Sequence, residues 1–543
     1  MNNELLFFDA FTRIGPRLKK HVAHPWSLDD VRAEMDHCSI SGALVASTLS
    51  VSYEPMYSNL QLSDQLKACD HLFPIWNVMP HQTGEFPEPA KLEALMRRHG
   101  VRAVTIYPKT NVWDWQADHA RVLFKWLAQR RILTIVDRNE FVHFAELDRF
   151  LAANPRLPLL LTHAGWHEQR MVLPLLLKYR NLHLTFDHFQ ANRILEYLHG
   201  AGCEDQLVFA SDAPLMSMGA HRCVVDYAEV PLAVRRKIAG GNLIRLLHGQ
   251  QPPRLRTNKN EDLIMRAARQ GQPLPVPVLD MHMHILHEGM QGVGGTCRMQ
   301  DGGPKGVFHR LQQLGYRGGG FMSWSAPVSG DSAGGNECTR QALDAAPKGY
   351  WGLATFDPVY FSQDQLRKMI PAWYRDRRFI GMKPYGGFGV EYHHASYDVW
   401  WQYGNRHRLY ALLHRTRGDF LEVNTLAKKY PRVRWVAVHC GSDYATADKA
   451  IESIRQHPNV YAEITLTPVT CGIIDYLVKN AGADRILYGS DLPMRDPRQQ
   501  LGWVVFSRLS LAQKQKVLAG NALNVIKPNL PLLPPANRPD MSV

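Results

Sequence analysis

Short apolar runs alternate with amphipathic, helix-like stretches through the first half of the chain. Helical patterns such as Lys91–His99 and Ala120–Arg130 separate the apolar runs, which lie at Leu5–Phe8, Ala43–Ala46, Phe73–Val78, Ala103–Tyr107, Ile132–Val136, Leu157–Leu161, Leu182–Phe186 and Leu207–Phe209. Eight β runs separated by helices predict a parallel barrel. An open doubly wound sheet is the competing fold, but no Gly-x-Gly-x-x-Gly follows the first run.

The same alternation returns in the second half. Its apolar runs lie at Val276–His282, Gly319–Trp324, Tyr350–Phe356, Phe379–Pro384, Tyr410–His414, Val433–His439, Val460–Ile464 and Ile486–Gly489. Glycine-rich stretches follow Leu286 and Trp324. Long loops after strands are where a barrel builds its substrate site.

Between the halves, residues 250–277 break the rhythm. Prolines stand at both ends of this segment and a charged helical piece, Glu261–Arg269, lies between them. The pattern therefore predicts an α/β protein of two tandem (β/α)8 TIM-like barrels, at 1–249 and 278–527, joined by this Pro-rich linker with its short helix. A Pro-rich tail, 528–543, is expected to run extended over the surface. Two barrels of ~250 residues would use nearly all of the 543-residue chain.

Four landmarks show that the second half repeats the first. Each landmark is an apolar run or turn with a polar residue at the matching position, and three of the offsets are 277, 276 and 279 residues. The aligned pairs are Asp137 with His414, His163 with His439, Asp212 with Asp491, and Asn242 with Asn521. Agreement at a nearly constant offset indicates a duplicated domain.

The first strand of the second half carries a candidate metal motif. Val278–Leu286 reads Val-Leu-Asp-Met-His-Met-His-Ile-Leu. Successive side chains of a strand point to opposite faces, so His282 and His284 share one face. Two imidazoles side by side at a strand end are a common start of a metal site. The structural alternative is two histidines in an ordinary half-buried strand.

This Asp-x-His-x-His motif after an apolar run resembles the first strand of the amidohydrolase superfamily, and with the later motifs it resembles the amidohydrolase-2 branch of hydrolases and decarboxylases. The resemblance implies a (β/α)8 barrel with one divalent metal ion at the carboxyl ends of its strands. Zn²⁺ suits three imidazoles and a carboxylate best, with Mn²⁺ or Fe²⁺ as alternatives. The positions that match the family's ligand pattern are His282, His284, His414 and Asp491.

His439 matches the position of the family's catalytic histidine. A neutral imidazole beside a metal can accept the proton of a bound water and later return it to a leaving group, and Asp491 could share that proton. A structural role for His439 stays open, because the first half retains its counterpart, His163. Candidate substrate contacts are Lys383, Arg495, Arg415 and Trp324, although either arginine could equally sit in a surface ion pair.

The first half lacks most of this set. Phe11 and Arg13 stand where the second half has His282 and His284, and Asp137 stands in place of His414. A cation at the Arg13 position would repel a metal, so we expect the first barrel to be degenerate and metal-free. Its remaining polar residues would be structural or line a vestigial pocket, with an unusual metal site of Asp137, His163 and Asp212 left open.

Composition and charge change this interpretation little. The net charge is +13, but the basic residues are interspersed and no nucleic-acid recognition motif accompanies them. There is no ~20-residue apolar run, no signal-peptide pattern, and the eight cysteines are scattered. We therefore expect a cytoplasmic protein with reduced thiols that acts on a small anionic molecule and binds neither nucleic acid nor membrane; a homo-oligomer is left open.

Three functions fit the sequence. The first is a metal-dependent hydrolase in the C-terminal barrel, in which metal-bound water attacks a small carboxylate-bearing ester, lactone or amide. The second is a non-oxidative decarboxylase of a small aromatic or unsaturated carboxylic acid, which needs the same ligands. The third is a non-catalytic scaffold that binds metal and turns nothing over.

Overall fold

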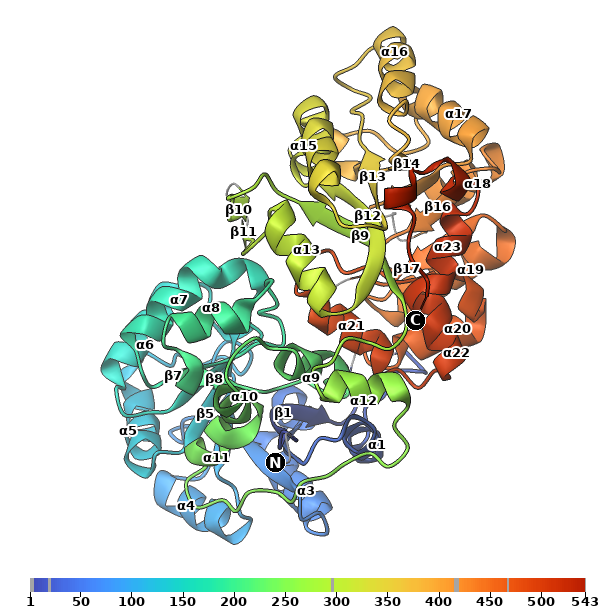
Figure 1. Cartoon of the computed structure of the whole chain (residues 1–543). Helices are drawn as coiled ribbons and strands as arrows, with labels where there is room; N and C mark the ends of the chain where they lie inside the picture. Colours follow the sequence, from blue (N-terminus) through green and yellow to red (C-terminus); the bar gives the residue numbers. More distant parts are fainter. Residues whose placement is uncertain (1–3, 18–20, 294–296, 415–418, 466–467, 543) are drawn as a thin grey trace. The chain divides into compact units, whose positions relative to one another are not determined.

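The computed structural model describes residues 4–17, 21–293, 297–414, 419–465 and 468–542. The chain forms two compact units, Met1–Glu261 and Asp262–Val543. The division falls inside the segment that the sequence analysis assigned to a linker. Each unit contains one large parallel sheet surrounded by helices (Figure 1).

The sheet of the first unit has eight parallel strands in sequential order. They are β1 (Phe8–Ile14), β2 (Gly42–Ser47), β3 (Leu72–Asn77), β4 (Ala103–Ile106), β5 (Leu133–Asp137), β6 (Leu159–Thr162), β7 (Leu182–Thr185) and β8 (Leu207–Val208). Backbone hydrogen bonds from Ala10 N–H to Phe209 O (2.9 Å) and from Asp212 N–H to Phe11 O (3.0 Å) join the first strand to the segment after the last. The sheet therefore closes into a barrel.

The helices of the first unit connect these strands. They are α1 (Leu28–Cys38), α2 (Leu49–Ser52), α3 (Pro55–Leu66), α4 (Pro89–Arg98), α5 (Arg121–Arg130), α6 (Phe144–Ala153), α7 (Gln169–Lys178), α8 (Ile194–Gly200), α9 (Met218–Asp226), α10 (Leu232–Arg236) and α11 (Asn242–Leu246). Helix α1 shows how the sequence starts such an element: Ser27 and Asp30 form a capping box, each side chain bonding the other residue's backbone N–H.

The second unit repeats this barrel. Its strands are β9 (Val278–Ile285), β12 (Tyr316–Ser323), β13 (Tyr350–Ala354), β14 (Phe379–Met382), β15 (Tyr410–Leu413), β16 (Arg434–Ala437), β17 (Val460–Glu463) and β18 (Ile486–Leu487). Hydrogen bonds from Met281 N–H to Tyr488 O (3.1 Å) and from His284 N–H to Leu492 O (2.7 Å) close the ring. A small antiparallel pair, β10 (Gly292–Val293) and β11 (Cys297–Arg298), lies in the loop after β9.

The helices of the second unit are α12 (Leu263–Arg269), α13 (Pro304–Gln313), α14 (Ser325–Val328), α15 (Ser332–Ala345), α16 (Gln363–Trp373), α17 (Asp398–His407), α18 (Leu421–Lys429), α19 (Tyr444–Gln456), α20 (Ile473–Ala481), α21 (Pro497–Val505), α22 (Leu511–Gln515) and α23 (Asn521–Ile526). In both units the helix that precedes the last one runs into a π-helical turn, Lys237–Gly241 and Lys516–Gly520. This shared irregularity supports the duplication.

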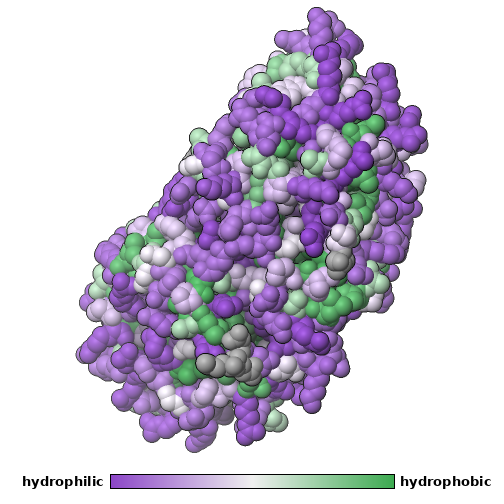
Figure 2. All heavy atoms as spheres, in the orientation of Figure 1, coloured by the Kyte–Doolittle hydropathy of each residue, from purple (hydrophilic) through white to green (hydrophobic). Residues whose placement is uncertain are grey.

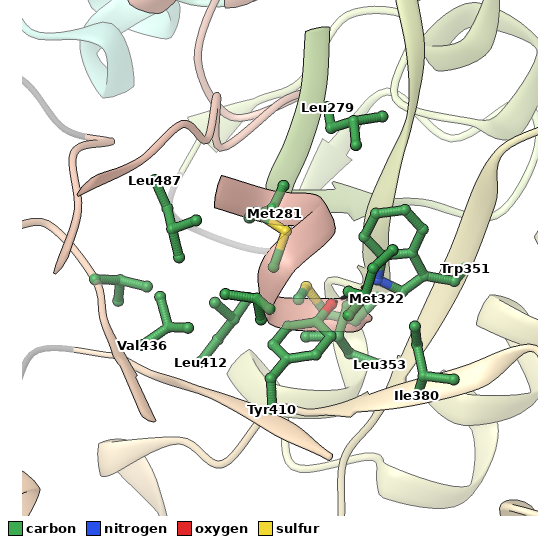
Figure 3. Packing of buried hydrophobic residues seen from close by; sticks show 14 of the residues in the cluster. Leu279, Met281, Met322, Trp351, Leu353, Ile380, Tyr410, Leu412, Val436 and Leu487 are labelled. Carbon is green, nitrogen blue, oxygen red and sulfur yellow. Dashed lines mark hydrogen bonds between the residues drawn. The ribbon is translucent and has the colours of Figure 1, made fainter. Parts of the chain in front are cut away.

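Buried side chains from most strands of the second unit form one core cluster (Figure 3). Met281 of β9, Leu412 of β15 and Leu487 of β18 are fully buried in it. Tyr410 keeps its hydroxyl satisfied there by accepting a hydrogen bond from Trp351 Nε1 at 2.7 Å. Helix α23 and the segment after it also contribute to the cluster.

The predicted fold class is confirmed, and most strands lie within two residues of their apolar runs. Two expectations need correction. The first strand begins at Phe8 and continues through polar residues to Ile14, because Asp9 and Thr12 make hydrogen bonds inside the sheet. The tail does not lie extended on the surface: it forms two short 3-10 turns, Leu530–Leu532 and Pro535–Asn537, and buries Leu533 in the core.

Polar side chains dominate the face drawn in Figure 2, with apolar residues in smaller areas. Among the described helices, none combines the length and the hydropathy needed to cross a membrane. The eight cysteines, all within the described residues, form no disulfide.

Candidate metal centre

Two histidines of β9 and an aspartate that follows β18 form the candidate metal centre. His284 Nε2 lies 3.4 Å, and His282 Nε2 3.8 Å, from the same oxygen, Asp491 Oδ1. All three side chains are buried, and each offers one ligand atom within 4.8 Å of the other two. Strand β9 therefore turns both imidazoles to one face, as alternation along a strand predicts.

The hydrogen bonds that close the barrel also hold these ligands together. Asp491 N–H donates to His282 O at 2.8 Å. Asp491 has φ 59°, a left-handed conformation that is uncommon for residues other than glycine. Such conformations cost free energy and persist where the surrounding structure determines them, often at functional sites.

Asp280, the first residue of the motif, has a structural role. Its Oδ1 accepts hydrogen bonds from His282 N–H (3.0 Å) and Ser490 N–H (3.1 Å), and burial raises the pKa of its carboxyl to about 7. Asp9 of the first unit accepts the same two kinds of bond, from Phe11 and Ser211. Because Asp9 has kept these bonds without the histidines, this carboxyl fastens the first strand to the segment after the last.

Glu463, the final residue of β17, is a site residue that the sequence analysis missed. Its Oε2 lies 3.5 Å from His282 Nδ1, and its Oε1 accepts hydrogen bonds from both the backbone N–H (2.8 Å) and the hydroxyl of Thr465. Burial raises the pKa of Glu463 well above its ordinary value. A carboxyl behind the far nitrogen of a metal-ligating histidine orients the imidazole and sets its tautomer. His282, His439 and Glu463 also form a second group of closely spaced ligand atoms.

Lys383 follows β14 and reaches the same imidazole. Its Nζ lies 3.0 Å from His282 Nε2, and the side chain is fully buried. Burial lowers the pKa of Lys383 to about 8, against the opposing effect of Asp491 and Glu463. Lys383 therefore contacts the candidate ligand His282 directly at its Nε2.

His439, two residues after β16, adopts φ 67° and is buried. Its Nδ1–H donates to the carbonyl of Thr465 at 2.5 Å, which leaves the lone pair on Nε2. Burial lowers the pKa of His439 to about 4, so the imidazole is neutral near pH 7. The centroid of its ring lies 5.5 Å from that of His282.

The other predicted residues lie around this centre. His414 follows β15, and its ring packs against the rings of His439 (4.9 Å between centroids) and Tyr385 (5.1 Å), outside the closely spaced group of His282, His284 and Asp491. Trp324 packs edge-on against His284, with 5.0 Å between ring centroids. Arg495 is buried, with Nε 3.5 Å from Asp491 Oδ2. Arg415 lies outside the described residues.

These residues fit a divalent metal ion. Burial lowers the pKa of His282 well below its ordinary value and lowers that of His284, so both imidazoles are neutral and can ligate. Burial alone would raise the pKa of Asp491, but the hydrogen bond with His284 and the charges of neighbouring groups, including Arg495, together lower it, so the carboxyl is ionised. Asp491 Oδ2 is buried and receives no hydrogen bond within the described part of the chain.

Replacing Glu463 with glutamine is expected to weaken metal binding by about 10–100-fold, because His282 would lose the carboxyl group that orients it. Competition with a chelator measures this affinity. The control is Thr185→Val at the end of β7, the matching position of the first unit, which should leave the affinity unchanged. An unchanged affinity for Glu463→Gln would show that this carboxyl does not support the ligand.

The corresponding place in the first barrel is filled by an arginine. Arg13 forms two parallel bonds to Asp212, Nε to Oδ1 at 2.7 Å and Nη2 to Oδ2 at 2.6 Å. His163 contributes a second cation, with Nε2 3.2 Å from Asp212 Oδ2 and Nδ1 3.0 Å from Asp137 Oδ2. Arg13 thus satisfies the carboxylate that aligns with Asp491. Among the described residues of this unit, His163, Asp187 and His188 also bring possible metal-ligand atoms close together.

His163 is expected to remain protonated above pH 7. Burial alone would lower its pKa, but Asp137, Asp187 and Asp212 raise it well above 6.5. A raised folded-state pKa means that this ion cluster stabilises the first unit most below pH 6.5 and less as the pH rises through the folded-state pKa. NMR titration of histidine-labelled protein measures it, with His163→Gln identifying the resonance. A measured pKa of His163 at or below 6.5 would contradict the ion cluster.

Fold and site together define the second unit as a parallel barrel with a candidate metal site at the carboxyl ends of its strands. The chain belongs to the amidohydrolase-2 family: the family model, described as amidohydrolase, matches residues 59–249 and 280–527. This family is metal-dependent, and its members include hydrolases and decarboxylases. The match in the first half begins after β1, the strand in which Phe11 and Arg13 replace the histidines.

Several solved structures are similar to part of the chain. 5-Carboxyvanillate decarboxylase from Sphingomonas paucimobilis is 14% identical, with 45% of this chain and 99% of that one covered and a TM-score of 0.36. 2,6-Dihydroxybenzoate decarboxylase from Rhizobium is 15% identical, with 47% of this chain and 99% of that one covered and a TM-score of 0.34. An amidohydrolase from Burkholderia multivorans is 13% identical, with 46% of this chain and 99% of that one covered and a TM-score of 0.36. A comparison with curated proteins found no match.

Proposed function

We propose that the second barrel is a metal-dependent hydrolase that acts on a small carboxylate-bearing ester, lactone or amide. The observation that carries the proposal is His439: a neutral, buried imidazole whose Nδ1–H is bound to Thr465 O and whose Nε2 is therefore a proton acceptor beside the candidate ligands. Hydrolysis needs such a group, because water must lose a proton and the leaving group must gain one.

The metal would be held by His282, His284 and Asp491, with His414 as the proposed fourth ligand. Zn²⁺ suits this donor set best, and Mn²⁺ or Fe²⁺ would also be accepted. When bound, such an ion lowers the pKa of water and polarises a carbonyl oxygen. Glu463 fixes the orientation of His282, and the neighbouring strands exclude water from behind both imidazoles.

Two buried cations account for the proposed substrate class. Lys383 and Arg495 both lie beside Asp491 and give the centre a positive side that favours a substrate carboxylate. Trp324 supplies an apolar wall next to His284. Arg415 is proposed as a further anion contact from its sequence position alone.

The test is an assay of carboxylate-bearing lactones, esters and amides with the metal-loaded full chain in ¹⁸O-labelled water. We expect label in the product acid, and a rate about 10²–10⁴ times lower for His439→Gln, which lacks the proton acceptor. His163→Gln in the first barrel is the matched control and should keep the rate. Release of carbon dioxide from an aromatic or unsaturated acid, without label uptake, would overturn the hydrolase proposal in favour of a decarboxylase.

A further inference from the structure

The first barrel has a polar cavity at the amino-terminal ends of its strands, away from the ion cluster of Arg13, His163 and Asp212. This cavity of about 610 Å³ lies where the chain enters β5, β6 and β7 and beside the end of α11. Four arginines line it: Arg131, Arg156, Arg180 and Arg245. We call it the arginine pocket. Its volume is within the range of small-molecule sites, roughly 300–1,000 Å³.

The positive charge of the arginine pocket is not neutralised by its own barrel. The described residues that line it include no aspartate or glutamate, and none of the four arginines forms an ion pair with a described carboxylate. Asp205, whose carboxylate interacts at longer range with Arg180 and Arg245, is paired with Lys237 at 2.8 Å. Clustered arginines without counter-ions attract anions, and the planar guanidinium groups match phosphate and carboxylate oxygens in pairs.

Two of the arginines are already oriented by the backbone. Arg180 donates to Gly202 O (3.1 Å) and to the side chain of Gln206, and Arg245 donates to Asp205 O at 2.7 Å. These bonds use only part of each guanidinium's five N–H groups. The remaining donors are therefore held in place before any ligand arrives, which reduces the entropic cost of binding.

A buried histidine adds an acceptor to this ring of donors. His183 of β7 lines the pocket, is only 4% exposed, and its Nδ1 has no hydrogen-bond partner in the described chain. The ring also donates a hydrogen bond to the backbone carbonyl of Asp205. Its Nε2 therefore carries the hydrogen, and Nδ1 keeps its lone pair. An unsatisfied buried acceptor is costly, and it would pair with a ligand O–H. A phosphate group has a second pKa of about 6, so a fraction still carries a P–O–H near neutral pH, whereas carboxylates with pKa values of about 4 carry no O–H there.

The second barrel provides an internal comparison. There, Pro458, Tyr461 and Asn524 replace Arg180, His183 and Arg245. The tail covers this end of the second barrel: Asn529 Nδ2 donates to His407 O (3.0 Å), Asn537 Nδ2 donates to Tyr350 O (2.8 Å), and Leu533 is buried. The duplicated fold therefore does not require an arginine-lined cavity at this place.

We propose that the arginine pocket binds a small phosphorylated molecule, with its phosphate groups on the four arginines and a P–O–H on His183 Nδ1. Pro155, Pro158 and Leu246 form apolar walls for the rest of the ligand. The site is separate from the candidate metal centre and does not depend on the proposed hydrolase activity.

Calorimetric titration of the full chain with inorganic pyrophosphate at low salt tests this. We expect one saturable site that binds pyrophosphate more tightly than citrate. The double variant Arg131→Gln, Arg156→Gln should bind at least about tenfold more weakly, since both arginines are exposed and support no other described contact. The matched control is Arg408→Gln, Arg432→Gln at the same positions of the second barrel, which should change the affinity less than about twofold.

Four results would overturn the proposal. The first is no saturable binding by the wild type, and the second is equal weakening in the control pair, which would indicate a general charge effect. Binding unaffected by either pair would place pyrophosphate elsewhere, for example at the metal centre, and would also count against it. Citrate binding as tightly as pyrophosphate would refute the phosphate assignment. His183→Leu should remove the preference for pyrophosphate, and an unchanged preference would remove His183 from the site.

Discussion

Replacing both His282 and His284 with alanine, or Asp491 with asparagine, is expected to reduce the metal content from roughly one ion per chain to almost none. These three side chains supply the closely spaced ligand atoms, and Asp491 Oδ1 lies within 3.8 Å of both imidazoles. Hydrolytic activity should fall to background with the metal. Elemental analysis of the purified full chain, after dialysis against metal-free buffer, gives the stoichiometry.

The matched control is Asp212→Asn in the first barrel. Asp212 aligns with Asp491 and has a similar left-handed backbone, but Arg13 occupies its carboxylate. Metal content should therefore stay unchanged in this variant, and circular dichroism verifies that it remains folded. Loss of the ion from Asp212→Asn, with retention in Asp491→Asn, would place the metal in the first barrel and refute the proposed centre.

Replacing Asp496 with alanine is expected to destabilise the second unit by about 3–5 kcal/mol. Asp496 and Arg498 are both fully buried and bond each other, with Arg498 Nε 2.8 Å from Asp496 Oδ1. The substitution removes a carboxylate that bonds the buried guanidinium of Arg498, and it also removes the side-chain cap of α21. Urea unfolding followed by fluorescence measures the change in the free energy of unfolding.

Two further variants separate the buried charge from other effects. The double variant Asp496→Leu, Arg498→Met removes both of the bonded charges together and should recover a large part of the lost stability. The surface control is Asp364→Ala, which removes an exposed partner of Arg367 and should change little. If the double variant is as unstable as Asp496→Ala, the cost comes from packing or capping and not from the loss of the ion pair.

The duplication also explains why the two barrels share a backbone and differ in chemistry. His163 and His439 both have positive φ, as do Asp212 and Asp491, so the strand-end geometry belongs to the fold. What differs is the first strand. In the first barrel its Arg13 bonds the carboxylate of Asp212, whereas in the second barrel its His284 faces the matching carboxylate of Asp491. Retention of His163 and Asp212 is thereby explained by an ion cluster.

The sequence alone determined the two barrels, the duplication and the three closely spaced candidate ligands His282, His284 and Asp491. These follow from local patterns: apolar runs at barrel spacing, and polar residues at the ends of those runs. It could not find Glu463, whose only signal is an acidic residue that ends an apolar run, or the contact of Lys383 with His282. Each meets His282 across more than 100 residues of chain, and strand closure alone decides which side chains converge. The tail was misjudged for the same reason, since prolines exclude regular structure but do not reveal that Leu533 has a core to enter.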